Sequence, residues 1–329
     1  MRSEKPILSV IVPAYNAERT LARTINSIQS QTLQCLEIWI VDDGSKDKTS
    51  EIADELAHQD ARIHVIHQEN GGCYRARLAA LRRIKTKWFG FVDADDTILP
   101  AMYERMISMA EENNLDVVQI DPVGEKGGLF ECYGNRESVM NNFVRPRLVE
   151  GKGAALVWNK LYRNQYDFNQ FLDINLISFE DYMFNLQLFI PVNRMGWLHE
   201  PLYNYVINAS CSTKNFNWRN VEGLERILKV RAKYLFKNGV SYELQNSSPW
   251  AACNFLNLIW LAATAGSSSW TRSISDVRRL VGLPEVARSV HGEWNRAVLA
   301  VMMARVLPSW LIVCLCRLVG WAHRRLKIF

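Results

Sequence analysis

The chain has 329 residues and a net charge of +5 at neutral pH, with 48% hydrophobic and 22% charged residues. That length can bury a sizeable core in one large domain or two modest ones, and the composition excludes a disordered chain. Acidic and basic residues mix through most of the sequence, and with so mild a net charge we expect no nucleic-acid partner.

The cysteines and the N-terminus bear on the compartment. The seven cysteines have no ladder spacing, and the first residues contain no apolar signal core. An odd, unpatterned set of cysteines is typical of reduced thiols in the cytosol. We therefore expect a cytoplasmic protein that is not secreted.

Strands and helices are predicted to alternate over the first 120 residues. Near-continuous apolar runs predict strands, and apolar residues at helical spacing predict the helices between them. The expected strands are 7–12, 36–41, 63–67, 88–92 and 116–120, and the expected helices begin near residues 21, 47, 71 and 102. This alternation predicts an α/β fold with a mostly parallel central sheet flanked by helices.

Acidic residues follow two of the expected strands. Asp42 and Asp43 follow the strand 36–41, and Asp93, Asp95 and Asp96 follow the strand 88–92. Carboxylates crowded together repel one another unless a cation lies among them. Mg²⁺ and Mn²⁺ prefer carboxylate and phosphate oxygens, and ligands of such sheets bind at the carboxyl ends of strands. The two clusters therefore predict a metal–nucleotide site.

The pattern changes after residue 120. Residues 121–150 are less regular and rich in glycine, and we expect loops there. Residues 151–208 resemble a second half of the same domain, with a helix opening near Phe179 and a strand at 196–199 that holds His199 in a structural role. From residue 217 the pattern is helical to the end.

The C-terminal tail combines apolar and basic residues. From Trp294 to Phe329 there are six Lys or Arg residues and no Asp or Glu. Its longest uncharged stretch, Val306–Cys316, is too short for a bilayer-spanning helix, which needs about 20 apolar residues. Flanking arginines and tryptophans favour a helix in the membrane interface. The alternative is a C-terminal core helix or an oligomer contact.

Short segments in a fixed order carry a family pattern. They are VIVPAYN at 10–16, VDDGS at 41–45, NGG at 70–72, AR at 76–77, FVDADD at 91–96, WNKLY at 158–162 and ED at 180–181. With these segments, residues 6–215 resemble the family 2 inverting glycosyltransferases, which share the glycosyltransferase A-type fold. The latter part of this stretch is similar to the acceptor-half motifs of the bacterial cell-surface polysaccharide branch. One departure is Leu78 and Ala80, where the family commonly has Asn and Gly, and we expect it to alter helix packing.

The resemblance implies a domain organisation and a set of partners. A catalytic domain over 1–216 would comprise a nucleotide-sugar half, 6–121, and an acceptor half, 122–216, followed by a helical C-terminal region over 217–329. It implies a UDP-sugar donor, a Mn²⁺ or Mg²⁺ ion, and a glycan or glycolipid acceptor. With the tail on the membrane surface, the expected location is the cytoplasmic face of the inner membrane, as a peripheral protein.

Candidate nucleotide-binding residues follow the first two strands. Pro13, Tyr15 and Glu18 follow the first, where an aromatic ring can stack on a nucleobase. The resemblance implies that Asp42 or Asp43 hydrogen-bonds the uracil edge and that Asp93 reaches the ribose. We favour Asp42, because the alternative role of a turn and helix cap suits Asp43.

Phosphate charge needs a counter-charge. Asp95 is the expected metal ligand, with Asp93 binding directly or through water, and the alternative is a capped turn with solvated acids. Arg77 either lies near the phosphates or is a solvated or structural ion-pair residue, and the sequence leaves both open.

The proton of an attacking hydroxyl needs a base. Asp181 is the candidate, and one carboxylate opposite the leaving group implies inversion. The neighbouring Glu180 can raise a pKa in the pair. The alternative is that both acids only stabilise a helix N-terminus. Trp158 and Tyr182 are candidates for stacking on acceptor sugars, or else core residues.

These residues favour an inverting transferase that moves a hexose from a UDP-sugar, UDP-glucose being the specific expectation, to a lipopolysaccharide core or another cell-surface glycan. A non-catalytic nucleotide-sugar-binding scaffold at the membrane is the alternative. A nucleotidyltransferase and a dinucleotide dehydrogenase are disfavoured, because the glycine-rich phosphate loop that each requires does not follow the first strand.

Overall fold

The computed structural model describes residues 5–149, 156–174, 176, 179–206 and 218–239. Contacts divide the chain into two compact units. The first comprises 1–144, 155–175 and 180–207, and the second comprises 145–154, 176–179 and 208–329. The division into catalytic and C-terminal regions at residue 216 stays a prediction.

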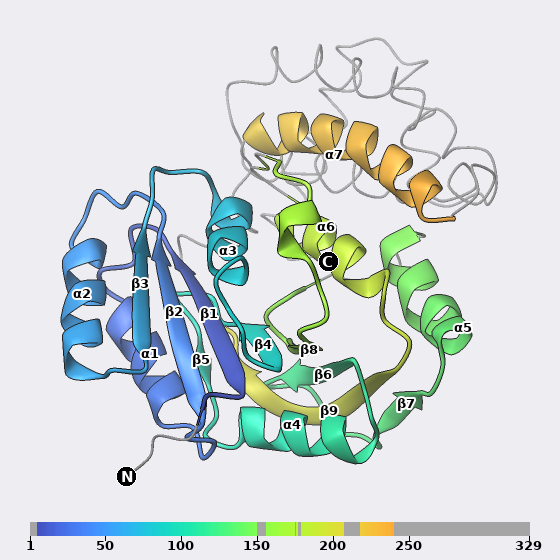
Figure 1. Ribbon diagram of the computed structural model, residues 1–329, viewed down its shortest axis with the longest axis horizontal. Coiled ribbons are helices and arrows are strands. Elements are labelled where there is room, and N and C mark those ends of the chain that lie inside the picture. Colours follow the sequence, from blue (N-terminus) through green and yellow to red (C-terminus); the bar gives the residue numbers. More distant parts are fainter. Residues whose placement is uncertain (1–4, 150–155, 175, 177–178, 207–217, 240–329) are drawn as a thin grey trace, which may run out of the picture. The chain divides into compact units, whose positions relative to one another are not determined.

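The first unit is built on one sheet, ordered β3-β2-β1-β4-β8-β6-β9-β5, with β7 beside β9 (Figure 1). Strands β1 to β4 pair in parallel, as does β6 with β9, whereas β8 runs antiparallel to both β4 and β6. The strands are β1 Leu8–Ala14, β2 Leu36–Asp42, β3 Ile63–His67, β4 Trp88–Phe91, β5 Thr97–Ile98, β6 Val117–Pro122, β7 Glu131–Tyr133, β8 Lys160–Arg163 and β9 Met195–Asn204.

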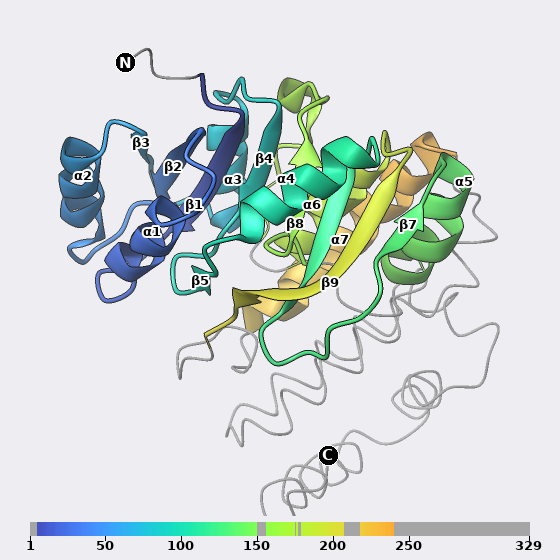
Figure 2. The same ribbon diagram turned by 90° about the horizontal axis from the view of Figure 1, so that it is seen from below.

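Helices cover both faces of the sheet. They are α1 Leu21–Gln29, α2 Thr49–Gln59, α3 Cys73–Leu81, α4 Met102–Glu112, α5 Arg136–Val139 and α6 Glu180–Phe189, with a π-helix at Met140–Val149 and a 3₁₀ turn at Phe168–Gln170. In the second unit, α7 spans Trp218–Lys237. Helix α3 packs on β1 and β2 and lies beside α6, while α4 packs on β6 and β9 (Figures 1 and 2).

The side chains of β4 show how the two faces are filled. Successive residues of a strand point to opposite faces. Phe91 points toward α6, where its ring lies 5.9 Å from that of Phe184. Gly90 faces α4, and a Cβ atom there would lie 2.9 Å from the Tyr103 hydroxyl. Glycine is required at this position because α4 approaches the strand so closely.

The predicted α/β class is confirmed, and each of the five strands expected before residue 121 is present. Two expectations of the sequence were incomplete. The region 121–150, expected to be looped, contains β7, α5 and the π-helix. The short antiparallel β8 was not predicted, because four residues between motifs carry too weak a period to identify a strand.

The helical prediction for the C-terminal region is tested only by α7. Residues 240–329, which include the apolar Val306–Cys316, lie outside the described residues. Within the described part of the chain, no helix has the length and apolar character needed to cross a bilayer.

Candidate active site

The carboxylate of Asp43 anchors the loop that leads into α3. Its two oxygens accept hydrogen bonds from the backbone N–H groups of Gly71, at 2.9 Å, and Gly72, at 2.8 Å. The Gln68 amide donates a third, at 2.7 Å. Asp43 is 3% exposed, and it binds the loop before α3 rather than capping the helix that follows its own strand.

Asp42 is the last residue of β2 and is held differently. Ser45 N–H donates to its Oδ1 at 3.1 Å, and its Oδ2 lies 3.3 Å from Nδ1 of His67. Burial opposes ionisation, but hydrogen bonds from Ser45, His67 and Ser50 outweigh it and lower the pKa of Asp42. Asp42 is therefore an ionised acceptor at the carboxyl end of the sheet.

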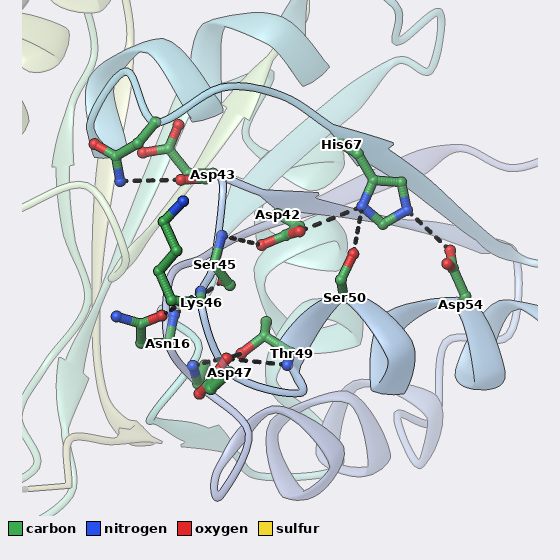
Figure 3. A network of polar contacts seen from close by, with 12 residues as sticks. Asn16, Asp42, Asp43, Ser45, Lys46, Asp47, Thr49, Ser50, Asp54 and His67 are labelled. Carbon is green, nitrogen blue, oxygen red and sulfur yellow. Dashed lines mark hydrogen bonds and ion pairs between the residues drawn. The ribbon is translucent and has the colours of Figure 1, made fainter.

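The loops after β1 and β2 are tied together (Figure 3). Asn16 N–H donates to the Ser45 hydroxyl at 3.0 Å, and the Asn16 side chain accepts from Lys46 N–H at 2.8 Å. The same loop presents Tyr15, whose side chain is 50% exposed and accessible to a ligand. Pro13 is buried within β1, opposite Val41.

Glu18 makes hydrogen bonds in both directions between the same two loops. Glu18 accepts from Lys48 N–H at 3.2 Å, and Glu18 N–H donates to Asp47 at 3.1 Å. Asp47 also accepts from Thr49 N–H at 3.0 Å, at the start of α2. The contact of Glu18 with a nucleotide stays a prediction.

The acidic turn after β4 separates its carboxylates into different environments. Asp96 is fully buried and accepts from the Tyr203 hydroxyl and from Val206 N–H, each at 2.8 Å. Burial raises the pKa of Asp96 to about 7. Asp96 therefore holds the turn to β9, and Arg23 donates to the backbone carbonyl of Asp95 on the same turn.

Arg77 joins two of the predicted site residues. Its guanidinium is 2% exposed and donates to Oδ1 of Asp93 at 2.9 Å and to Oδ1 of Asp181 at 2.5 Å. Its Nε finds no hydrogen-bond partner among the residues that the structure describes. Arg77 thus forms ion pairs with Asp93 and Asp181, and its proximity to the phosphates stays a prediction.

The sequence model of family 2 glycosyl transferases matches residues 9–181, which contain Asp42, Arg77, Asp93 and Asp181. The chain belongs to this family.

Two curated relatives each align with about two thirds of the chain. It is 34% identical over 225 residues to the uncharacterized glycosyltransferase EpsJ of Bacillus subtilis, covering 64% of this chain and 63% of EpsJ. It is 30% identical over 249 residues to the uncharacterized glycosyltransferase YibD of Escherichia coli, covering 70% of this chain and 72% of YibD. The chain thus spans less than two thirds of the length of EpsJ.

Solved structures support the fold. Residues 1–349 of Staphylococcus aureus TarS in complex with UDP-GlcNAc superpose with a TM-score of 0.66 at 19% identity, covering 98% of this chain and 92% of that one. The mannosyltransferase PcManGT of Pyrobaculum calidifontis, in complex with GDP-Man and Mn²⁺, gives a TM-score of 0.53 at 15% identity, covering 99% of this chain and 89% of that one. At these identities the likeness concerns the fold, and it confirms the glycosyltransferase A-type prediction.

Acidic side chains outnumber basic ones around Arg77 in the glycosyltransferase. Burial raises the pKa of Asp93, with Asp181 and Asp95 adding repulsion that Arg77 only partly offsets. Burial and the neighbouring Asp181 raise the pKa of Glu180 to about 7. Arg77 pairs with Asp93 and Asp181 only, while Glu180 and Asp95 add further acidic groups nearby, an excess of carboxyl groups that fits a divalent cation.

The protein side chains alone do not complete a metal site. In the described part of the chain, no group of three His, Cys, Asp or Glu side chains is arranged to hold an ion. Mg²⁺ and Mn²⁺ are commonly bound by one or two carboxylates together with substrate phosphates. Asp93 and Asp95 fit that pattern, and their role as metal ligands stays a prediction.

The candidate acceptor residues are mostly buried. Trp158 is 6% exposed, and its ring stacks on those of Tyr203 and Tyr205, with centroids 4.3 and 5.8 Å away. Tyr182 is also 6% exposed. This burial favours the core alternative for both residues, although acceptor contact at an exposed edge stays a prediction.

Two histidines pair with acids in the glycosyltransferase. His199 on β9 lies between Asp121, at 2.9 Å, and Glu131, at 3.2 Å. Sequence reasoning missed His67, which contacts a predicted site residue, Asp42. The signal was available: both residues end neighbouring parallel strands, and they stand opposite each other in the register.

Proposed function

We propose that this glycosyltransferase is an inverting enzyme that moves a hexose from a UDP-sugar to a cell-surface glycan, with Asp181 as general base and a divalent cation at Asp93 and Asp95. The pairing of Asp93 and Asp181 with one guanidinium carries the proposal. The shared guanidinium holds Asp93 and Asp181 near each other, which supports a role for Asp93 on the donor side of the reacting carbon and for Asp181 as the base on the other side.

The proposed step is a single displacement. An acceptor hydroxyl oxygen forms a bond to the anomeric carbon as the bond from that carbon to the diphosphate oxygen breaks. The electron pair leaves with UDP, and the hydroxyl proton moves to the Asp181 carboxylate. Attack opposite the leaving group inverts the anomeric centre.

Arg77 prepares Asp181 for this task. The Arg77 guanidinium donates a hydrogen bond to Oδ1 of Asp181 at 2.5 Å and so orients the carboxylate. The second oxygen of Asp181 accepts from Val157 N–H at 3.3 Å, so both oxygens are oriented. Glu180, whose pKa is raised to about 7 by burial and by Asp181, is the neighbouring carboxyl group against which the role of Asp181 is tested.

The donor side combines Asp42, Tyr15 and Asp93. The Asp42 carboxylate accepts a uracil N–H, the exposed Tyr15 ring stacks on the base, and Asp93 reaches the ribose. A divalent cation held by Asp93 and Asp95 would supply Lewis-acid stabilisation of the departing diphosphate, worth several kcal/mol. Arg77 balances part of the carboxylate charge that remains around the ion.

We further propose UDP-glucose as the donor and a lipopolysaccharide core as the acceptor, on the cytoplasmic face of the inner membrane. The basis is the resemblance of the segments 158–162 and 180–181 to the bacterial cell-surface branch, together with the basic, tryptophan-containing tail. A screen of UDP-sugars for hydrolysis and transfer, with the purified protein and Mn²⁺, tests the donor.

The variant Asp181→Asn tests the base. Asn keeps one oxygen, which can accept from Arg77, and places an NH2 group where the second carboxylate oxygen was. It cannot take up the proton, so we expect turnover to fall by about 10² to 10⁴. UDP binding, measured by calorimetry with Mn²⁺, should be retained. Turnover is measured as UDP released in the presence of acceptor.

Glu180→Gln is the matched control, because it neutralises the neighbouring carboxyl group of the same helix. We expect it to lose less than about tenfold in turnover, since general-base catalysis is expected to stay with Asp181. Near-normal turnover of Asp181→Asn would remove Asp181 from the mechanism. A larger loss in Glu180→Gln would move the base to Glu180.

The second candidate function is a non-catalytic nucleotide-sugar-binding scaffold at the membrane. The buried pairing of Asp181 favours it in one respect, because a carboxylate held by an arginine can be purely structural. Mn²⁺-dependent UDP binding without transfer or hydrolysis of any UDP-sugar would establish the scaffold and refute the enzyme.

A further inference from the structure

A histidine lies between two carboxylates behind the proposed nucleobase site. His67, the last residue of β3, has its Nδ1 3.3 Å from Oδ2 of Asp42 and its Nε2 3.0 Å from Oδ1 of Asp54 on α2 (Figure 3). The Ser50 hydroxyl, also from α2, lies 3.0 Å from Nδ1. The pairing of β2 with β3 fixes this arrangement, because Asp42 and His67 are register partners.

Hydrogen-bond chemistry assigns a charge to this imidazole. Ionised carboxylates only accept hydrogen bonds, so an imidazole can donate to both of them only in the imidazolium form, which carries an N–H on each nitrogen. A neutral imidazole has a single N–H. If Nε2 keeps the proton for Asp54, the bare Nδ1 can accept from the Ser50 hydroxyl and no longer donates to Asp42, which keeps the hydrogen bond from Ser45 N–H.

The surroundings favour the charged form. Partial burial opposes it, but the hydrogen bonds and charges of Asp54 and Asp42 outweigh burial and raise the pKa of His67. The titratable groups that face the ring are Asp42 from β2 and Asp54 from α2. The side chain of His67 is 44% exposed, so it exchanges protons with solvent.

The contacts of Asp42 make its orientation depend on His67. Ser45 N–H fixes Oδ1, and His67 fixes Oδ2, so the plane of the carboxylate is held at both atoms. An ionised carboxylate has about four acceptor positions, so capacity remains for one more donor. A base that offers an N–H, such as uracil, meets this requirement.

We propose that His67 is a positioning residue of the donor site, whose imidazolium holds Asp42 toward the nucleobase and makes a nucleoside diphosphate bind more tightly to the protonated protein. The inference rests on the proposed function, because it takes Asp42 as a nucleobase ligand. It adds a residue and a pH dependence that the reaction itself does not require.

The experiment compares UDP binding by calorimetry, with Mn²⁺, at pH 6 and pH 8.5 in three proteins. They are the wild type, His67→Gln, and the control His64→Gln, which changes another histidine of β3 that lies beside Glu37 and stacks on Trp39. Titration of the UDP phosphate and of Mn²⁺-bound water is common to all three. Only the differences between the proteins therefore bear on His67.

From pH 6 to pH 8.5, the affinity for UDP should fall in all three proteins. We expect the fall to be about tenfold larger in the wild type and in His64→Gln than in His67→Gln, which is the effect of one hydrogen bond to a charged group. At pH 6, His67→Gln should bind UDP about tenfold more weakly than the wild type. Identical profiles for the wild type and His67→Gln would overturn the inference.

A second variant keeps the test valid if His67→Gln folds poorly. Asp54→Asn retains an oxygen for Nε2 but removes the distal charge, and the Asp54 side chain is 55% exposed. It should lower the pKa of His67, followed by NMR of the imidazole, and move the drop in UDP affinity to lower pH. A lowered pKa without a move in affinity would refute the coupling.

The outcomes separate this inference from the proposed function. A wild type that binds no UDP at any pH refutes both. A wild type that binds and transfers from UDP-sugars, with a pH profile that His67→Gln shares, refutes only the role of His67.

Discussion

Arg77 is the residue on which the charge balance of the site depends. Its guanidinium is 2% exposed and faces Asp93 and Asp181, which repel each other. A buried ion pair contributes little over an apolar substitute, but removing one partner leaves the other charge buried and uncompensated. Removing Arg77 should therefore lower the free energy of unfolding by more than its ion pairs raise it over an apolar substitute.

The variant Arg77→Gln should destabilise the protein by about 3 kcal/mol at pH 8. Without the guanidinium, the pKa values of Asp93 and Glu180 rise further above their unfolded values. A carboxyl group with a raised folded pKa binds protons preferentially in the folded state, so its penalty is present above that pKa and is relieved as pH falls. We therefore expect a smaller deficit at pH 5, measured by urea unfolding.

Arg75→Gln is the control for this prediction. Arg75 lies on the same helix but is 43% exposed, and its pair with Asp173, at 2.9 Å, is a surface pair worth less than about 1 kcal/mol. Equal losses of stability in the two variants at both pH values would contradict the argument.

Residue chemistry at strand ends was predictable, but the pairings were not. The acids after β2 and β4 and the candidate base were found from residue type and position. Arg77 and Asp181 are 104 residues apart in sequence, and no local pattern indicates that they touch. Asp42 and Asp43 have different roles because they accept hydrogen bonds from different donors. The donors to Asp43 lie in the loop 68–72, which no local pattern connects to β2.

At the scale of elements, the crossing of two loops at the end of β2 positions the donor side. Gly44 has a φ of 71°, and a Cβ atom there would lie 2.8 Å from the backbone nitrogen of Asn70. The Asn70 side chain donates to the carbonyl of Asp43 at 3.0 Å, so the two backbones are held at this close approach. Glycine is required for both the dihedral angle and the space.

The variant Gly44→Ala should therefore cost about 2 kcal/mol of unfolding free energy, from backbone strain and the displacement of the loop 68–72. It should also weaken UDP binding, because Asp42 and Asp43 precede the strained residue. Urea unfolding and calorimetry measure the two effects. Gly134→Ala is the control, because a Cβ there would meet nothing within 4 Å. If the two variants are equally stable, the close approach of the two loops does not require glycine at position 44.

Most strands and helices can be predicted from the spacing of apolar residues in the sequence, and the exceptions have a physical cause. Strands β1 to β4 are buried runs with helices between them, so apolar runs and helical spacing identify them. Strand β8 has four residues and lies between β4 and β6, although both precede it in sequence. Such long-range insertion is set by packing that a local window does not contain.

At the scale of the whole molecule, the sequence of the C-terminal tail bears on the proposed location at the membrane. The segment from Trp294 to Phe329 has six basic and no acidic residues, a composition that suits an anionic membrane surface. A lipid-linked or lipopolysaccharide acceptor would then be met at the membrane. The competing interpretation is that this segment packs on the protein or on a second copy.

Vesicle sedimentation with the full chain separates these interpretations. Each basic residue near an anionic surface contributes about 1 kcal/mol, so replacing Arg317, Arg324 and Arg325 by Gln should weaken binding to phosphatidylserine-containing vesicles by tenfold or more. Binding should also weaken as salt is raised, because the attraction falls off within a Debye length. The control removes the same charge by changing Arg82, Arg83 and Lys85, which are exposed near the end of α3, to Gln. Two results would contradict membrane binding by the tail: equal binding of the two triple variants, or no binding of the wild type to anionic vesicles at low salt. Either result would favour a contact of the tail with protein, and the acceptor would then reach the site by another route.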